Sequence, residues 1–136
     1  MENVFQFLTP KSQTFYIESG STLRQALEKM EFHKFSIVPI LKENGEYDNT
    51  LSTGDILKFI KDKGEFNLLE SNTIHIKDLE RYRPYRAFMV NESFDDLVKL
   101  SLDQNFVPVV DDRNMFIGII KRKTIIQYLI NKNYEK

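Results

Sequence analysis

The sequence predicts a mixed α/β fold of the α+β kind, in which a unit of strand, helix, strand, strand and helix occurs twice. Three repeated features lead to this prediction. An apolar run with a central proline occurs twice, and Pro39 and Pro108 are 69 positions apart. An amphipathic helix pattern precedes each run, and a further strand and helix follow each run at the same shift. We expect the two repeats to pack with pseudo-two-fold symmetry.

The first helix of each repeat has a regular apolar face. In the first repeat this face consists of Leu23, Ala26, Leu27 and Met30. These residues fall at i, i+3, i+4 and i+7, which places them on one side of a helix. The second repeat shows the same pattern from Phe94 onward, a shift of 71 positions. Because the strands are shifted by 69, we expect the two extra residues of the first repeat in the turn that follows its helix.

Capping and turn residues mark the ends of these elements. Thr22 with Gln25 forms a T-x-x-Q capping box, and Ser93 is a favourable N-cap for the second repeat. The Asn-Gly pair at 44–45 predicts a tight turn between two strands, and residues 111–114 hold the equivalent place.

The expected strands are 14–17, 35–41, 47–52, 87–90, 104–110 and 116–121, and the expected helices are 22–33, 53–63, 94–104 and 122–133. We assign residues 1–63 to the first repeat with an N-terminal leader, 64–86 to a polar connector and 87–136 to the second repeat. Within the connector, residues 76–79 are expected to form a short helical turn, with residues 4–8 as its counterpart in the leader.

Composition excludes several classes of function. Lys and Arg total 19 against 20 Asp and Glu, so a net charge of -1 gives no reason to expect a nucleic-acid partner. The chain has no cysteine, which excludes disulfides, thiolate nucleophiles, zinc ribbons and iron–sulfur ligation. His33 and His75 are the only histidines and lack metal-ligand spacing, so we expect no metal. Because no P-loop, G-x-G-x-x-G or G-x-S-x-G motif occurs, we expect no enzyme and no required cofactor.

The N-terminus predicts no secretion signal, because it lacks both a basic start and a long apolar stretch. No run of about 18 apolar residues occurs, so no membrane span is expected. A cytoplasmic location is therefore the expectation.

The order β-α-β-β-α, a proline inside the middle strand and a hairpin followed by a helix resemble the CBS domain. Two such units in tandem resemble a CBS pair, and the resemblance covers nearly the whole chain. In that family, the third strand and the following helix carry Gly, two apolar residues, Thr or Ser, two variable residues and Asp. The resemblance implies a regulatory module that binds an adenosine-containing ligand.

The first repeat keeps most of this family pattern. Ser52 supplies the hydroxyl and Asp55 the carboxylate, whereas Asn49 replaces the glycine. A carboxylate has two acceptor oxygens suited to the two hydroxyls of a ribose. Ser52 lies where a helix begins, and the free backbone N–H groups there favour a phosphate.

The second repeat keeps Gly118 but has Lys121 in place of the hydroxyl and Thr124 in place of the carboxylate. This change argues against a ribose site in the second repeat. Lys121, Arg122 and Lys123 open its last helix, and we expect them to supply cations to the phosphates of a ligand bound by the first repeat.

The resemblance also implies that main-chain groups of the first strand and of the proline-containing strand hold the adenine. The candidates are Thr14, Tyr16, Ser36, Ile37 and Pro39.

Each of these motifs has a simpler interpretation. Ser52 and Asp55 form an S-x-x-D pattern that caps a helix without any ligand. The cations at 121–123 are also compatible with a solvated basic turn. Residues 81–86 interleave three arginines with two tyrosines, a composition typical of a stacking surface for RNA or a base, but a solvated linker is the favoured interpretation.

The leading hypothesis is a sensor of AMP, ADP, ATP, S-adenosylmethionine or cyclic di-AMP, the usual ligands of the family. Small free-standing CBS proteins of some bacteria are similar and act on a separate target, so we expect an unidentified target protein as partner. The family also implies a homodimer formed mainly through the helices at 22–33 and 94–104. The alternative hypothesis is a ligand-free CBS scaffold that serves dimerisation or protein interaction, because Asn49, Lys121 and Thr124 depart from the family pattern.

Overall fold

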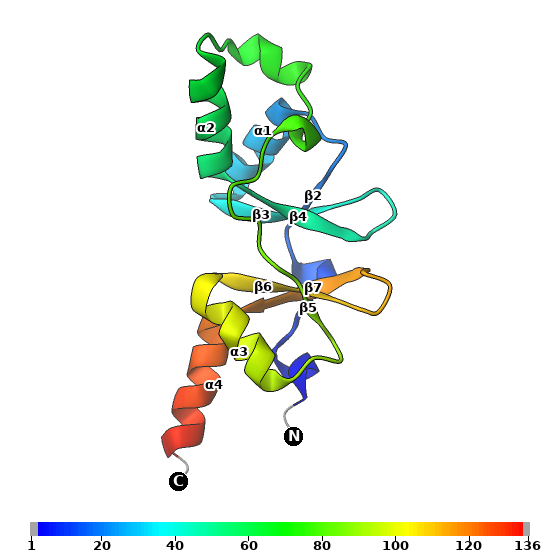
Figure 1. Cartoon of the computed structure of the whole chain (residues 1–136), viewed down its shortest axis with the longest axis vertical. Coiled ribbons are helices and arrows are strands. Elements are labelled where there is room, and N and C mark those ends of the chain that lie inside the picture. Colours follow the sequence, from blue (N-terminus) through cyan, green and yellow to red (C-terminus); the bar gives the residue numbers. More distant parts are fainter. Residues whose placement is uncertain (1–2, 135–136) are drawn as a thin grey trace. The chain divides into compact units, whose positions relative to one another are not determined.

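The computed structural model describes residues 3–134, which form two compact units. The first-repeat unit comprises Phe15–Pro84. The second-repeat unit combines the residues up to Thr14 with those from Tyr85 onward. In each unit, both helices lie on one face of a small sheet, as Figure 1 shows. The expected mixed α/β fold is confirmed.

The first-repeat unit contains β2 (Ile17–Glu18), α1 (Leu23–His33), β3 (Ile37–Leu41), β4 (Tyr47–Ser52) and α2 (Thr53–Lys63), followed by short 3-10 helices at Leu68–Asn72 and Ile76–Asp78. Its sheet has the order β2-β3-β4, in which β2 is parallel and β4 antiparallel to β3. The short helical turn predicted in the connector is confirmed at Ile76–Asp78.

The second-repeat unit begins with a 3-10 helix at Val4–Phe7, β1 (Thr9–Pro10) and a 3-10 helix at Lys11–Gln13, and continues with β5 (Phe88–Met89), α3 (Phe94–Asp103), β6 (Phe106–Val110), β7 (Phe116–Lys121) and α4 (Arg122–Tyr134). Its sheet has the order β1-β7-β6-β5. Within the described residues, no helix is long and apolar enough to cross a bilayer.

The two hairpins have the same register. Pro39 lies opposite Thr50, and Pro108 lies opposite Ile119, with one bulge at the equivalent place in each hairpin. Proline has no N–H to donate and normally interrupts a central strand. Here the parallel neighbour β2 spans two residues and pairs only with the residues that follow Pro39, and β5 does the same after Pro108. The parallel strands are short enough not to reach either proline. No ladder hydrogen bond is therefore lost because proline lacks an N–H.

The predicted helix faces pack into the cores. Leu23, Ala26 and Met30 of α1 are buried against β3 and β4, together with Ile56 of α2. The predicted caps are confirmed, because Thr22 and Ser93 each form a complete capping box. Of the two extra residues of the first repeat, one lengthens α1 and the other lengthens the turn before β3.

The strand predicted at 14–17 is wrong for most of its length. The structure has only Ile17–Glu18 as β2, because β3 offers partners there only at Ile40 and Leu41. Thr14 instead closes a turn, since its N–H donates to Lys11 O at 3.0 Å and its Oγ1 donates to Pro10 O at 2.9 Å.

The leader folds in the second-repeat unit, although the sequence analysis grouped it with the first repeat. Thr9 and Pro10 form β1 and pair with Ile119 and Gly118 of β7. A Cβ added at Gly118 would overlap the carbonyl oxygen of Thr9 and would lie 3.0 Å from Pro10 Cα. The absence of a side chain at Gly118 thus allows the leader to approach β7 closely.

We expect Gly118→Ala to lower the free energy of unfolding by about 1–3 kcal/mol, because the new methyl group collides with the leader backbone. Gly20→Ala is the matched control, since no atom lies within 4 Å of a Cβ built there. Urea denaturation measures both variants. A Gly118→Ala protein as stable as wild type would contradict the close approach of the leader.

Candidate functional site

The N-terminus of α2 is built by a reciprocal capping box. Ser52 Oγ accepts a hydrogen bond from the Asp55 N–H at 3.1 Å, and the Ser52 N–H donates to Asp55 Oδ2 at 3.0 Å. The helix-capping interpretation of this S-x-x-D pattern is therefore confirmed. It does not by itself exclude a ligand, because each carboxylate oxygen has more than one lone pair.

Asp55 also receives a hydrogen bond from the connector. The Tyr82 backbone N–H donates to Asp55 Oδ1 at 2.9 Å. With Ser52 on its other oxygen, the carboxylate has a backbone donor on each side and Asp55 is only 7% exposed. Sequence reasoning missed this contact, because residues 55 and 82 are far apart in the chain and a backbone N–H has no sequence signature.

Arg81 lies half-buried beside the same carboxylate. Burial lowers the pKa of its guanidinium, and the negative charges of Asp55 and Asp48 oppose this shift. Arg81 Nη1 donates to Leu79 O at 2.6 Å. Among residues 3–134, the buried Nε has no hydrogen-bond partner. The connector thus brings a partly desolvated cation to the start of α2.

Asn49 occupies the position that Gly118 holds in the second repeat. It lies in β4 opposite Ile40, and its buried Oδ1 has no hydrogen-bond partner among the described residues. Buried acceptors are normally paired, so this oxygen is unusual. The first repeat therefore has an unpaired polar side chain where the second repeat has none.

The predicted adenine-binding residues are brought together only in part. Ile37 pairs with Ser52, and Ser36 O accepts a hydrogen bond from the Thr53 N–H at 2.9 Å, so both lie beside the start of α2. Pro39 lies further along β3, opposite Thr50. Tyr16 precedes β2 in this unit, whereas Thr14 belongs to the second-repeat unit.

The cations of the second repeat lie where β7 meets α4. Lys121 and Lys123 are exposed. Arg122 Nε donates to Ser101 O at 2.7 Å, and Nη2 donates to Leu102 O at 3.4 Å. These are carbonyl groups of the last turn of α3, where a cation is favourable to the helix dipole. Arg122 thus has a structural task, and the phosphate-binding role of the three cations stays a prediction.

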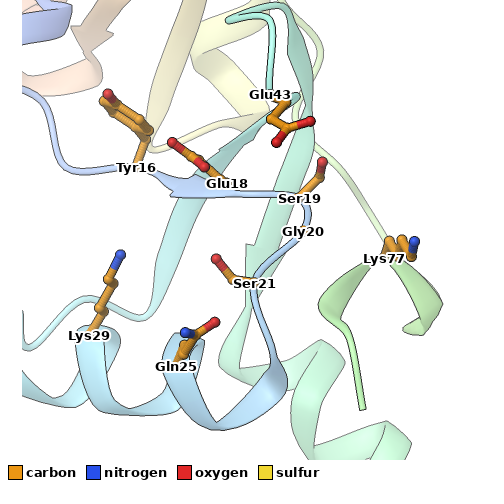
Figure 2. Close-up of a pocket in the computed structure, with 9 residues that line it drawn as sticks. All are labelled: Tyr16, Glu18, Ser19, Gly20, Ser21, Gln25, Lys29, Glu43 and Lys77. Atoms are coloured by element: carbon orange, nitrogen blue, oxygen red, sulfur yellow. The ribbon is translucent and has the colours of Figure 1, made fainter. Parts of the chain in front are cut away.

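A polar pocket of about 810 Å³ lies beside β2 and the start of α1 (Figure 2). It is lined by Tyr16, Glu18, Ser19, Gly20, Ser21, Gln25, Lys29, Glu43 and Lys77. Only Tyr16 belongs to the predicted site. The pocket combines two carboxylates and two ammonium groups from segments that are distant in the sequence. No local motif predicts such a lining.

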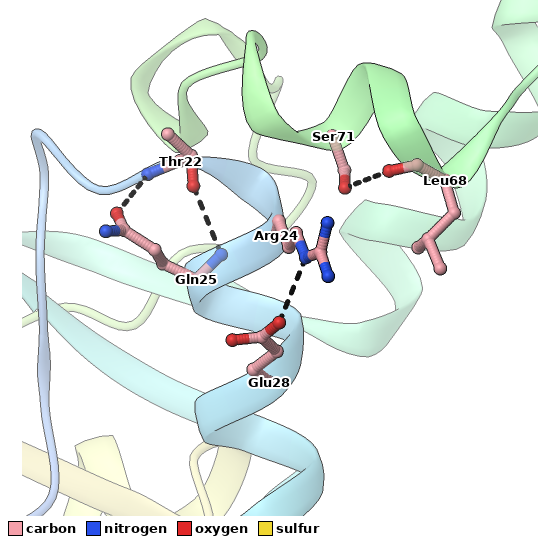
Figure 3. A network of polar contacts seen from close by, with 6 residues as sticks. All are labelled: Thr22, Arg24, Gln25, Glu28, Leu68 and Ser71. Carbon is pink, nitrogen blue, oxygen red and sulfur yellow. Dashed lines mark hydrogen bonds and ion pairs between the residues drawn. The ribbon is translucent and has the colours of Figure 1, made fainter.

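The start of α1, which borders this pocket, is held by connector residues. Figure 3 shows the capping box of α1 and the neighbouring hydrogen bond between Ser71 and Leu68. The Leu23 N–H donates to Ile74 O at 2.7 Å, and the Ile76 N–H donates to Ser21 O at 3.1 Å. Beyond the Thr22–Gln25 capping box, buried Ser71 donates its hydroxyl to Leu68 O. The exposed Arg24–Glu28 ion pair, also drawn in Figure 3, contributes little to stability, since surface pairs are worth about 0–1 kcal/mol.

Within residues 3–134, no cluster of three or more His, Asp or Glu could hold a metal ion.

A family model for the CBS domain matches the chain twice, at residues 6–62 and 76–131. The chain therefore belongs to the CBS domain family and contains two CBS domains in tandem. This confirms the resemblance drawn from the proline strands and from the pattern at Ser52 and Asp55. No curated protein sequence matches the chain.

Solved structures share the fold at low sequence identity. CbpB in complex with c-di-AMP matches with a TM-score of 0.86 and 21% identity, covering 98% of this chain and 88% of that chain. CbpB of Listeria monocytogenes in complex with c-di-AMP matches with a TM-score of 0.85 and 17% identity, covering 99% of this chain and 100% of that chain. CBSX2 in complex with AMP matches with a TM-score of 0.72 and 22% identity, covering 98% of this chain and 99% of that chain. At these identities the likeness shows the fold alone.

We expect Asp55→Ala to lower the free energy of unfolding by about 1.5–3 kcal/mol, because it removes charge-assisted hydrogen bonds and leaves the Tyr82 N–H unpaired. Asp96→Ala is the matched control. Asp96 occupies the same position in the capping box of α3, where it exchanges two hydrogen bonds with Ser93. Its loss should therefore be smaller, and equal losses in a urea titration would contradict a stabilising role for the connector contact.

Proposed function

We propose that this CBS pair is a regulatory module that binds an adenosine-containing ligand at the start of α2 in the first repeat. The observation that carries the proposal is the position of Ser52 and Asp55. Both residues of the family pattern are kept there, at a helix N-terminus within a chain that belongs to the family. The complexes of CbpB with c-di-AMP and of CBSX2 with AMP support a ligand of this class.

The chemistry of the two residues supports distinct roles. Asp55 would accept hydrogen bonds from the ribose hydroxyls, because an ionised carboxylate is an acceptor only. The Ser52 hydroxyl would donate to a phosphate at the start of α2, since the helix dipole favours negative charge there. Ser36 and Ile37 lie beside Ser52, and this proximity supports a base bound next to the two strands.

The second repeat is not proposed as a ribose site. Thr124 replaces the carboxylate, and Arg122 is occupied with the last carbonyl groups of α3. We infer that the module transmits ligand binding to a target protein rather than performing catalysis, because the family is regulatory and the site contains no nucleophile paired with a base.

Calorimetric titration of AMP, ATP and c-di-AMP tests the site. We expect Asp55→Ala to weaken binding by roughly 10- to 150-fold, since a lost charge-assisted hydrogen bond is worth about 1.5–3 kcal/mol. Thr124→Ala is the matched control and should bind like wild type. Unchanged affinity of Asp55→Ala, or a stronger dependence on Thr124, would refute the assigned site and favour a ligand-free scaffold.

Exposed apolar side chains favour a second function, homodimerisation. On α1, Phe32 is 82% exposed, and on α3, Leu102 is 73% exposed. These are the two helices from which the family resemblance implies a dimer. A single exposed apolar side chain needs no covering surface, but its burial in an interface would be favourable, which supports a dimer through these helices.

We expect light scattering at high micromolar concentration to give the mass of a dimer. Phe32→Glu and Leu102→Glu should shift the mass toward the monomer, because a charge in an apolar interface is desolvated without a partner. Leu68→Glu is the control, since Leu68 is also exposed but lies in the connector, outside both helices. A monomeric wild type, or variants that all remain dimers, would contradict an interface on α1 and α3.

A further inference from the structure

The connector contacts the residue to which the proposed function assigns the ribose. Tyr82 donates its backbone N–H to Asp55 Oδ1 at 2.9 Å, and Ser52 donates to Oδ2 at 3.0 Å. Asp55 is left 7% exposed. A ribose has to reach the carboxylate oxygens directly, so a carboxylate covered to this extent is not free to bind it. We call residues 80–83 the connector latch; Leu79 lies outside it, because its side chain is buried in the core of the first repeat.

The leader of the second-repeat unit shows how an equivalent segment can lie. Leu8 ends the 3-10 helix of the leader, and Leu79 ends the 3-10 helix of the connector. After Leu8 the chain forms β1 and pairs closely with β7 over Gly118. After Leu79 no described strand pairs with the outer edge of β4. Asn49 holds the position of Gly118 there, and its side chain prevents the same close approach.

The latch is held in place by few contacts. Its described anchors are the Tyr82 N–H on Asp55 and the half-buried Arg81, whose Nη1 donates to the carbonyl oxygen of Leu79 at the edge of the core. Arg81 Nε is buried without a partner in the described part of the chain. The Tyr82 side chain is 72% exposed. An unpaired buried donor destabilises the closed position, which partly offsets the loss on release of the Tyr82 bond to Asp55 and of the Arg81 contacts with Leu79 and Asp55.

We propose that the connector latch competes with the ligand for the Asp55 carboxylate, so that ligand binding releases residues 80–83 from the start of α2. The inference rests on the proposed function, because it requires the ligand to bind Asp55. It adds the means by which an occupied site changes the surface of the protein. Release frees the half-buried Arg81 guanidinium to contact a target protein, next to the already exposed Tyr82 and Arg83 side chains.

Backbone amide exchange of the full chain tests the latch, with AMP and c-di-AMP as probes. The Tyr82 amide should be protected in the free protein, and saturation with a bound probe should speed its exchange by about ten-fold or more. The Ser52 amide, on the other carboxylate oxygen, reports in the same spectrum whether the helix cap stays intact. Binding that leaves Tyr82 protected overturns the latch alone, whereas failure of every probe to bind overturns the proposed function as well.

A pair of variants separates the N–H from the side chain. Tyr82→Pro removes the backbone N–H that donates to Asp55. Because this hydrogen bond no longer competes with the ligand, the probe should bind about 2- to 10-fold more tightly. Tyr82→Ala keeps the donor and removes an exposed ring, so its affinity should match wild type. Equal affinity of the two variants, or weaker binding by Tyr82→Pro, would overturn the proposal. If Tyr82→Pro does not fold, the exchange measurement on the wild-type chain decides.

Discussion

The register of one hairpin determines the rest of each repeat. β3 and β4 pair with Pro39 opposite Thr50, and β6 and β7 pair in the same way around Pro108. A slip by one residue would turn every side chain of a strand to the other face of the sheet. Ser52 is both the last residue of β4 and the N-cap of α2. The register therefore places the start of that helix, and with it the candidate site.

The same scaffold has been adapted differently in the two repeats. In the second repeat, Gly118 lets the leader add a strand to the sheet, and Arg122 serves the end of α3. In the first repeat, Asn49 excludes a close neighbour at the edge of β4, and the capping box at Ser52 keeps its carboxylate. The repeat that gives up the added strand is thus the one that retains the groups suited to a ribose and a phosphate.

Stability and binding meet at Asp55. Its carboxylate caps α2 and anchors the connector, so capping and ligand binding are not separate interpretations of the same motif. A group that is already hydrogen-bonded binds a ligand at the expense of its existing partners. The bond from the Ser52 N–H joins two residues of the same helix start, so it can persist when the other carboxylate oxygen changes its partner. The bond from the Tyr82 N–H instead links two segments that are distant in the sequence. A ligand that binds Asp55 as proposed would therefore displace the connector.

The sequence by itself determined the repeat, the helix faces, the caps and the helix-start motif, because these depend on spacings within about one or two helical turns or strands. It also singled out Ser52 and Asp55 as the candidate site. It failed for the strand at 14–17, which depends on the partners that β3 offers. It gave no indication of the bond from Tyr82 to Asp55, of the pairing of the leader with β7 or of the polar pocket beside β2. These features join segments far apart in the chain through backbone groups, which every residue type carries, so only the tertiary structure decided them.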